Sequence, residues 1–187
     1  MLVSPQAERN WESLCSVLEE VLEEQSHRQL FGLELGSGTG QHVIRFAQKI
    51  PFVTWQPSDI KQESRDSIKA YIAATNAKTV LQPVHLDASE PWEKWAGLHN
   101  NSSDTSGSAG QLLKQNGLLM TYGVYAINGI ITPSCNERLD AELRQLNPDW
   151  GLPDIDVLRQ LAYGSGLRME RMIEMDDYYK CLVFRKL

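Results

Sequence analysis

The chain has 187 residues, of which 42% are hydrophobic and 22% charged, and a net charge of −6 at pH 7. This composition is that of an ordinary globular domain and excludes a chain disordered throughout, a collagen and a coiled coil. Its acidity argues against tight nucleic-acid binding, which needs a basic surface. We expect a single domain over residues 1–187.

The first half of the chain alternates helices with strands. Helical spacing of apolar residues predicts a helix at 7–24, and a short apolar run predicts a strand at 30–35 that ends in a glycine-rich turn. A helix at 41–49, a strand at 52–56, a helix at 60–76 and a strand at 80–86 follow. The third helix is expected to bury Ile60, Ile68 and Ile72. Such alternation predicts an α/β fold with a doubly wound, mostly parallel sheet.

The second half has a different pattern. A strand at 118–122 precedes a helix at 137–146, for which Ser134 and Glu137 have the spacing of a capping box. A further helix is expected at 154–163. Strands at 167–175 and 180–186 are joined by a connection too short for a crossover, so we expect a C-terminal antiparallel hairpin.

Cysteine usage and apolar run lengths bear on the compartment. Cys15, Cys135 and Cys181 are far apart and form no CxxC pair, which is typical of reduced thiols in the cytoplasm or nucleus. No run reaches the length of a membrane helix, and the start lacks the apolar run of a signal peptide. The four histidines have no metal-ligand spacing, so no metal is expected.

The strongest motif is a glycine-rich loop at a strand-to-helix junction, Glu34-Leu35-Gly36-Ser37-Gly38-Thr39-Gly40. Glycines let a ligand approach bare backbone, and the following helix offers free N–H groups. Dinucleotide enzymes use GxGxxG, but Gln41 occupies the place of the third glycine. An acid followed by GxGxG is the spacing of S-adenosylmethionine enzymes. We expect Glu34, Gly36, Ser37, Gly38 and Gly40 to bind that cofactor.

Two further carboxylates end the next two strands. Asp59 could accept bonds from the ribose hydroxyls and Asp87 could meet the adenine amino group. Ligands of open parallel sheets bind at this carboxyl edge. The alternative interpretations are structural: the loop as a tight turn, and Asp59 and Asp87 as helix caps.

Several runs resemble the methyltransferase-like protein 26 family. They include GSGTGQH at 36–42, WQPSD at 55–59, YGVY at 122–125 and NPDWGL at 147–152, and together such runs cover most of the chain. The resemblance implies the class I methyltransferase fold and S-adenosyl-L-methionine as cofactor, with an unknown methyl acceptor. The chain departs from the family at residues 175–179, MDDYY, where the family usually has MPANN.

Five residues are candidates for the acceptor side of the site: Arg9, Asn10, His42, Tyr122 and Tyr125. The leading helix often covers the ligand in this fold, and His42 directly follows the glycine loop. Each also has a plain alternative: a solvated helix face for Arg9 and Asn10, a capping or solvent role for His42, and packing for the two tyrosines.

A strand is missing from the middle of the pattern. The family has an apolar strand between Asp87 and Leu118, whereas residues 97–110 contain only two apolar residues, Leu98 and Ala109. A central parallel strand needs a nearly continuous apolar run. We therefore expect a flexible loop at 97–110 and a shortened form, such as alternative splicing produces. Two structures could follow: the strand at 118–122 pairs with the strand at 30–35 in a six-stranded sheet, which we favour, or the sheet keeps a gap and is only marginally stable.

The sequence favours an S-adenosylmethionine-dependent methyltransferase, in which no residue stands out as catalytic base. The acceptor would be a small molecule or a protein. The alternative is a methyltransferase-like binding or interaction module without turnover. Gln41 disfavours a dehydrogenase.

Overall fold

The computed structural model describes residues 1–90 and 112–187. The chain divides into two compact units, Met1–Asp104 and Thr105–Leu187. The loop expected at 97–110 lies wholly outside the described residues, as does most of the helix for which Asp87 is an alternative cap.

The first unit begins with α1 (Pro5–Leu22), which a short 3₁₀ turn, η1 (Glu23–Gln25), extends. The Ser4 hydroxyl accepts a bond from the Ala7 N–H and so caps the first turn, and Pro5 suits a first helical position because it lacks an N–H. One face of α1 buries Leu14, Cys15, Val17 and Leu18. The amphipathic helix predicted near the N-terminus is confirmed.

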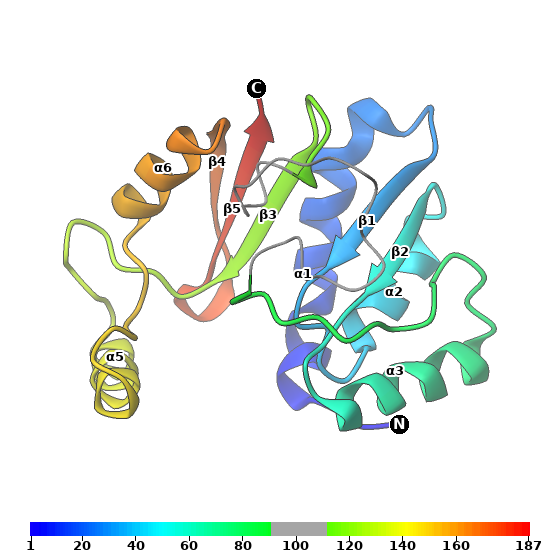
Figure 1. Cartoon of the computed structure of the whole chain (residues 1–187), viewed down its shortest axis with the longest axis horizontal. Coiled ribbons are helices and arrows are strands. Elements are labelled where there is room, and N and C mark those ends of the chain that lie inside the picture. Colours follow the sequence, from blue (N-terminus) through cyan, green and yellow to red (C-terminus); the bar gives the residue numbers. More distant parts are fainter. Residues whose placement is uncertain (91–111) are drawn as a thin grey trace. The chain divides into compact units, whose positions relative to one another are not determined.

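Two parallel strands form the sheet of the first unit, β1 (Leu30–Glu34) and β2 (Val53–Pro57) (Figure 1). The helix α2 (Gln41–Lys49) connects them, and α3 (Gln62–Thr75) follows β2. The core residues Val43, Ile50 and Ile68 are at most 1% exposed. Trp55 lies so close to Gly32 that a Cβ there would be 2.8 Å from its ring, so the strand pair requires glycine at that position.

The strand expected at 80–86 is reduced to two isolated parallel bridges, Trp55 with Val80 and Ser58 with Val84. Proline at position 83 has no N–H to donate, so a continuous ladder cannot form across it. Gln56 uses its side chain instead, donating from Nε2 to the Gln82 carbonyl at 2.9 Å. The segment therefore follows β2 as expected without being a regular strand.

The second unit contains an antiparallel sheet of order β3-β5-β4. Its strands are β3 (Leu118–Gly123), β4 (Leu167–Glu174) and β5 (Lys180–Lys186), which confirms the C-terminal hairpin. Two helices, α5 (Ser134–Leu146) and α6 (Ile155–Gly164), separate β3 from β4. The core cluster comprises Tyr125, Ile155, Leu167, Leu182 and Phe184.

Two local expectations were wrong. Ile60 is 52% exposed, because α3 begins only at Gln62. Ser134 is the first residue of α5 rather than its cap, a position that Pro133 takes without a side-chain bond. Within each unit the described strands are hydrogen-bonded, β1 with β2 and β5 with β3 and β4, and the expected pairing of β1 with β3 stays a prediction.

Candidate functional site

The glycine-rich loop follows β1 and has the backbone geometry that its glycines permit. Gly36, Gly38 and Gly40 have φ values of 63°, 55° and 93°. A Cβ at Gly40 would lie 2.9 Å from Cγ1 of Ile68, so this glycine serves the packing of α3. A Cβ at Gly36 or Gly38 would meet no described atom within 4 Å. At these two positions the bare backbone is open to a ligand.

Hydrogen bonds fasten the loop to the end of β2. The Ser37 N–H donates to the Ser58 carbonyl at 2.8 Å, and the Ser58 N–H donates to the Ser37 hydroxyl at 3.1 Å. The Ser58 hydroxyl donates to the Glu34 carbonyl at 2.7 Å. Both serines are buried. Ser37 therefore shapes the loop, and its side chain is occupied by that task.

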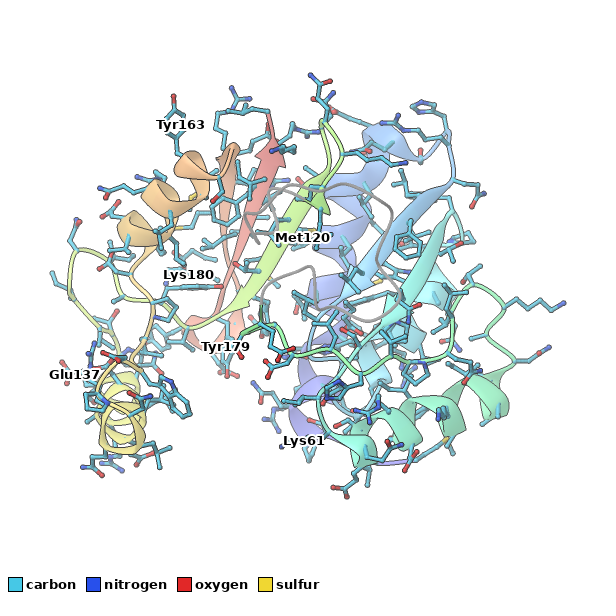
Figure 2. All side chains as sticks on the ribbon, in the orientation of Figure 1. Lys61, Met120, Glu137, Tyr163, Tyr179 and Lys180 are labelled. Carbon is cyan, nitrogen blue, oxygen red and sulfur yellow. The ribbon has the colours of Figure 1, made fainter. Side chains whose placement is uncertain are left out.

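Asp59, directly after β2, connects the loop with the start of α3. Its side chain is buried, and Oδ2 accepts a bond from the Gly38 N–H at 2.9 Å. Oδ1 accepts from the N–H of Lys61, which is labelled in Figure 2, at 2.8 Å. The carboxylate thus braces the helix start and the glycine loop together. Each of its oxygens has a second lone pair that could accept a ligand hydroxyl.

Glu34 is the most unusual group of the first unit. Its Oε2 is buried and has no hydrogen-bond partner among the described residues. Burial raises the pKa of Glu34 to about 7; the Ser37 hydroxyl opposes this and the charge of Asp59 adds to it. A buried carboxylate oxygen without a partner requires an explanation, and a bound cation or donor would supply one. The structure thus brings Glu34, the glycine loop and Asp59 together.

Asp87 forms a local turn. Its Oδ1 accepts from the Ser89 N–H at 2.9 Å and from the Ser89 hydroxyl at 2.6 Å, and these bonds lower the pKa of the carboxyl. The helix that Asp87 could cap lies for the most part outside the described residues, so the capping alternative stays untested. Its contact with an adenine group stays a prediction.

His42 connects α2 with α1. Its Nε2 lies 2.6 Å from Oδ1 of Asn10, and its ring stacks on Phe46 at 5.6 Å between centroids. Burial lowers the pKa of His42. Arg9 is exposed on α1. The pair of Asn10 and His42 holds the two helices together, which is a structural role, and an additional role toward a substrate stays a prediction.

Gln41 has a role that the sequence did not reveal. Its side chain is 3% exposed; Oε1 accepts bonds from the Ser4 N–H at 2.5 Å and from the Thr39 hydroxyl at 2.8 Å. Its Nε2 donates to Oε1 of Glu8. In the sequence, Gln41 served only as a reason to disfavour dinucleotides. The sequence showed that a polar residue stands where the GxGxxG motif has its third glycine. It did not show that this residue bonds to Ser4 and Glu8, which are distant in the chain.

The two candidate tyrosines belong to the second unit. Tyr125 is 8% exposed in the core cluster, and its hydroxyl donates to Oγ1 of Thr121 at 2.7 Å. Its packing interpretation is therefore supported. Tyr122 stacks on Tyr179, which Figure 2 labels, with 4.9 Å between ring centroids. Their relation to an acceptor stays a prediction.

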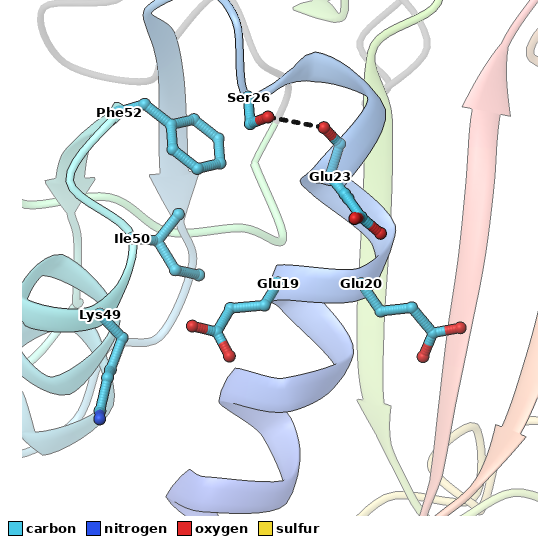
Figure 3. Close-up of a pocket in the computed structure, with 7 residues that line it drawn as sticks. All are labelled: Glu19, Glu20, Glu23, Ser26, Lys49, Ile50 and Phe52. Atoms are coloured by element: carbon cyan, nitrogen blue, oxygen red, sulfur yellow. Dashed lines mark hydrogen bonds between the residues drawn. The ribbon is translucent and has the colours of Figure 1, made fainter.

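A cavity of about 360 Å³ lies elsewhere in the first unit (Figure 3). Lys49, Ile50 and Phe52 line it together with Ser26 and the acidic side chains of Glu19, Glu20 and Glu23. The glycine loop precedes α2, whereas Lys49 is the last residue of α2 and Ile50 and Phe52 follow it. The cavity is therefore at the opposite end of α2 from Glu34 and Asp59, and we do not assign it to the candidate site.

Neither a cluster of metal ligands nor a membrane-spanning helix is found in the part of the chain that the structure describes. Within residues 1–90 and 112–187, no three histidine, cysteine, aspartate or glutamate side chains gather as metal ligands would. None of the helices in these two ranges combines the length and the apolarity that crossing a membrane requires.

Solved methyltransferase structures share this fold. A proposed sarcosine dimethylglycine methyltransferase from Galdieria sulphuraria has a TM-score of 0.70 at 15% identity, over 96% of this chain and 86% of that one. An O-methyltransferase family protein from Burkholderia thailandensis has a TM-score of 0.65 at 15% identity, over 96% of this chain and 60% of that one. A SAM-dependent methyltransferase from Aquifex aeolicus has a TM-score of 0.57 at 14% identity, over 90% of this chain and 89% of that one.

These comparisons define the class of the fold. The chain has the α/β fold of these methyltransferases, with a parallel sheet and a C-terminal antiparallel sheet, and it spans 60% of the Burkholderia protein's length. A family model described as "Protein of unknown function (DUF938)" matches residues 1–107 and 100–186. The chain belongs to this family.

Proposed function

We propose that the chain is an S-adenosylmethionine-dependent methyltransferase whose cofactor site lies in the first unit. The observation that carries this proposal is the buried, unpartnered Oε2 of Glu34 beside a loop whose backbone is bare at Gly36 and Gly38. The fold supports it, because the similar structures include O-methyltransferase and SAM-dependent methyltransferase proteins.

The residues present fit the chemistry of this cofactor. Its amino-acid end carries an ammonium group, for which an unpartnered carboxylate is a suitable acceptor. Its carboxylate would be held by backbone N–H groups at the start of α2. Asp59 would accept the ribose hydroxyls with its remaining lone pairs, and Asp87 would receive the adenine amino group. When bound, S-adenosylmethionine supplies a methyl group that a positively charged sulfur already activates.

The chain's own contribution is binding and orientation. Glu34 is held by a loop that Ser37, Ser58 and Asp59 fix through hydrogen bonds. A rigid loop places the donor for an in-line transfer, and such positioning accounts for much of the rate that an enzyme gains over solution. A cation at Oε2 would favour the ionised form of Glu34, so a proton leaves that carboxyl when the cofactor binds.

We further propose that this family member is a shortened form related to the methyltransferase-like protein 26 family. The sequence runs named above support the relation. The family model matches in two successive stretches, 1–107 and 100–186, which supports an internal shortening near residue 100. The acceptor is a small molecule or a protein, and the free cysteines favour the cytoplasm or nucleus.

One observation favours a second function, a methyltransferase-like binding module without turnover. Residues 97–110 contain only two apolar residues, Leu98 and Ala109, so the sequence lacks a strand that the methyltransferase-like protein 26 family has at this place. A module of this kind would still bind the cofactor through the first unit, and methyl transfer alone would distinguish it from an enzyme.

Isothermal titration calorimetry with S-adenosylmethionine, S-adenosylhomocysteine and NADH tests the proposed site. We expect the first two to bind and Glu34→Gln and Asp59→Asn each to weaken binding about tenfold, because a charge-assisted bond is lost. Asp66→Asn, an exposed carboxylate on α3, is the matched control and should leave affinity unchanged. A folded wild-type chain that binds neither adenosyl compound refutes the proposal, and NADH binding would favour a dehydrogenase.

A further inference from the structure

The segment that precedes and begins α1, residues 2–10, is connected to the glycine loop through one side chain. Gln41 accepts from the Ser4 N–H at 2.5 Å on one side and from the Thr39 hydroxyl at 2.8 Å on the other. It also donates to Glu8, whose second oxygen lies 3.4 Å from Arg45. We call residues 2–10 the N-terminal segment. Because Gln41 is 3% exposed, water cannot replace these bonds without a rearrangement.

A second set of bonds reaches the same loop from the same segment. The Leu2 N–H donates to Oγ of Ser67 at 2.7 Å, and the Ser67 hydroxyl donates to the Thr39 carbonyl at 2.8 Å. The Leu2 carbonyl accepts from the Tyr71 hydroxyl at 2.8 Å. Thr39 is thus held at its side chain by Gln41 and at its carbonyl by Ser67. Both partners also hold the N-terminal segment.

The conformation of the loop depends on such external contacts. Glycines at three positions with positive φ lose more backbone freedom on ordering than other residues do. Thr39 lies between Gly38 and Gly40, so it is, beside Ser37, a second position at which side-chain bonds restrict the loop. The Gln41 amide supplies one of these bonds and ties it to residues that lie more than thirty positions earlier in the chain.

We infer that Gln41 is a positioning residue, which couples docking of the N-terminal segment to the affinity of the glycine loop for its cofactor. This inference rests on the proposed cofactor site. The coupling is reciprocal, so a bound cofactor must protect the N-terminal segment by the same factor by which the docked segment favours the cofactor. Gln41 touches no reacting atom and acts through Thr39 and Ser4.

The test combines binding with hydrogen–deuterium exchange on the whole chain. Gln41→Leu keeps the volume and removes all three bonds, and Gln48→Leu, exposed on the same helix, is its control. Gln41→Glu places a carboxylate against that of Glu8, so the bond between the two side chains is lost. Combining Glu8→Gln with Gln41→Glu restores the bond with donor and acceptor reversed, and the new carboxylate at position 41 keeps the oxygen that Ser4 and Thr39 need.

We expect Gln41→Leu and Gln41→Glu to bind S-adenosylhomocysteine about tenfold more weakly, because bonds at the loop are lost. The double exchange should recover most of this loss, and Gln48→Leu should bind as the wild type does. In the wild type the ligand should slow amide exchange in residues 2–10, and in Gln41→Leu it should not. If Gln41→Leu fails to fold, the comparison of Gln41→Glu with the double exchange decides.

Two outcomes separate this inference from the proposed function. A folded wild type that does not bind S-adenosylhomocysteine refutes the cofactor site and the coupling with it. A wild type that binds, together with Gln41 variants of equal affinity or with exchange in residues 2–10 that the ligand leaves unchanged, refutes the coupling alone. A purely structural Gln41 would lower the melting temperature and leave both readouts as in the wild type.

Discussion

Replacing Glu34 by glutamine tests whether the end of β1 holds a destabilising carboxylate. Glutamine has almost the same shape but cannot ionise. Burial raises the pKa of Glu34 from 4.5 to about 7, with Oε2 unpartnered among the described residues. The folded chain therefore holds a proton that the unfolded chain releases between these two pH values.

The size and sign of the effect follow from this difference. A rise from 4.5 to about 7 corresponds to about 3 kcal/mol, at about 1.36 kcal/mol for each pKa unit. Because the folded pKa is the higher one, the unfolding free energy falls as pH rises from 4.5 to about 7. The loss of unfolding free energy is complete above about pH 7 and absent below pH 4.5. Since domains are stable by only about 5–15 kcal/mol, the change is measurable.

Urea denaturation at pH 5 and pH 8 measures it. We expect Glu34→Gln to raise the unfolding free energy by about 3 kcal/mol at pH 8 and by about 1 kcal/mol or less at pH 5. Glu12→Gln, an exposed glutamate on α1, should change little at either pH. An equal change at both pH values, or a loss of stability at pH 8, would show that the Glu34 carboxylate is satisfied in the folded chain.

Three further predictions concern packing and reactivity. Gly40→Ala should lower the unfolding free energy by about 2–5 kcal/mol, since the added Cβ would meet Ile68. Gly36→Ala should lower it by only about 1–2 kcal/mol, since there only the positive φ is unfavourable. Equal losses of the two variants in urea denaturation would contradict this reasoning. Tyr125→Phe should cost about 1 kcal/mol through its lost hydroxyl bond, and an unchanged melt would show that this bond does not stabilise the fold. Exposed Cys135 should react with a thiol reagent before buried Cys181, whose pKa burial raises to about 11; simultaneous labelling of the native chain would be inconsistent with this burial.

The sequence revealed those parts of the fold that local patterns determine. The helix over residues 41–49 is α2 with the expected bounds, because its apolar face and the preceding Gly40 mark it clearly. The segment at 80–86 has the apolar pattern of a strand, yet Pro83 breaks its ladder, and the pairing depends on which carbonyls β2 presents. Pairing partners are a property of the folded chain, so a pattern could not settle them.

For the candidate site, too, the types of residue could be predicted from the sequence, whereas their contacts could not. The glycine loop and Asp59 were evident as types of residue at strand ends, and the structure brings them together with Glu34. The sequence could not reveal that Oε2 of Glu34 lacks a partner, because burial of one atom depends on every neighbouring element. It also could not reveal that Gln41 bonds to Ser4, since contacts between distant residues leave no local pattern.

The order of strands in the second unit has a consequence for biosynthesis. β5 lies between β3 and β4 in its sheet, although it follows both in the chain. While the ribosome is still making residues 180–186, β3 and β4 therefore have no strand between them to pair with. The C-terminal sheet is therefore completed only after residues 180–186 have been made, and until then β3 and β4 have unpaired edges of the kind that make nascent chains prone to aggregation.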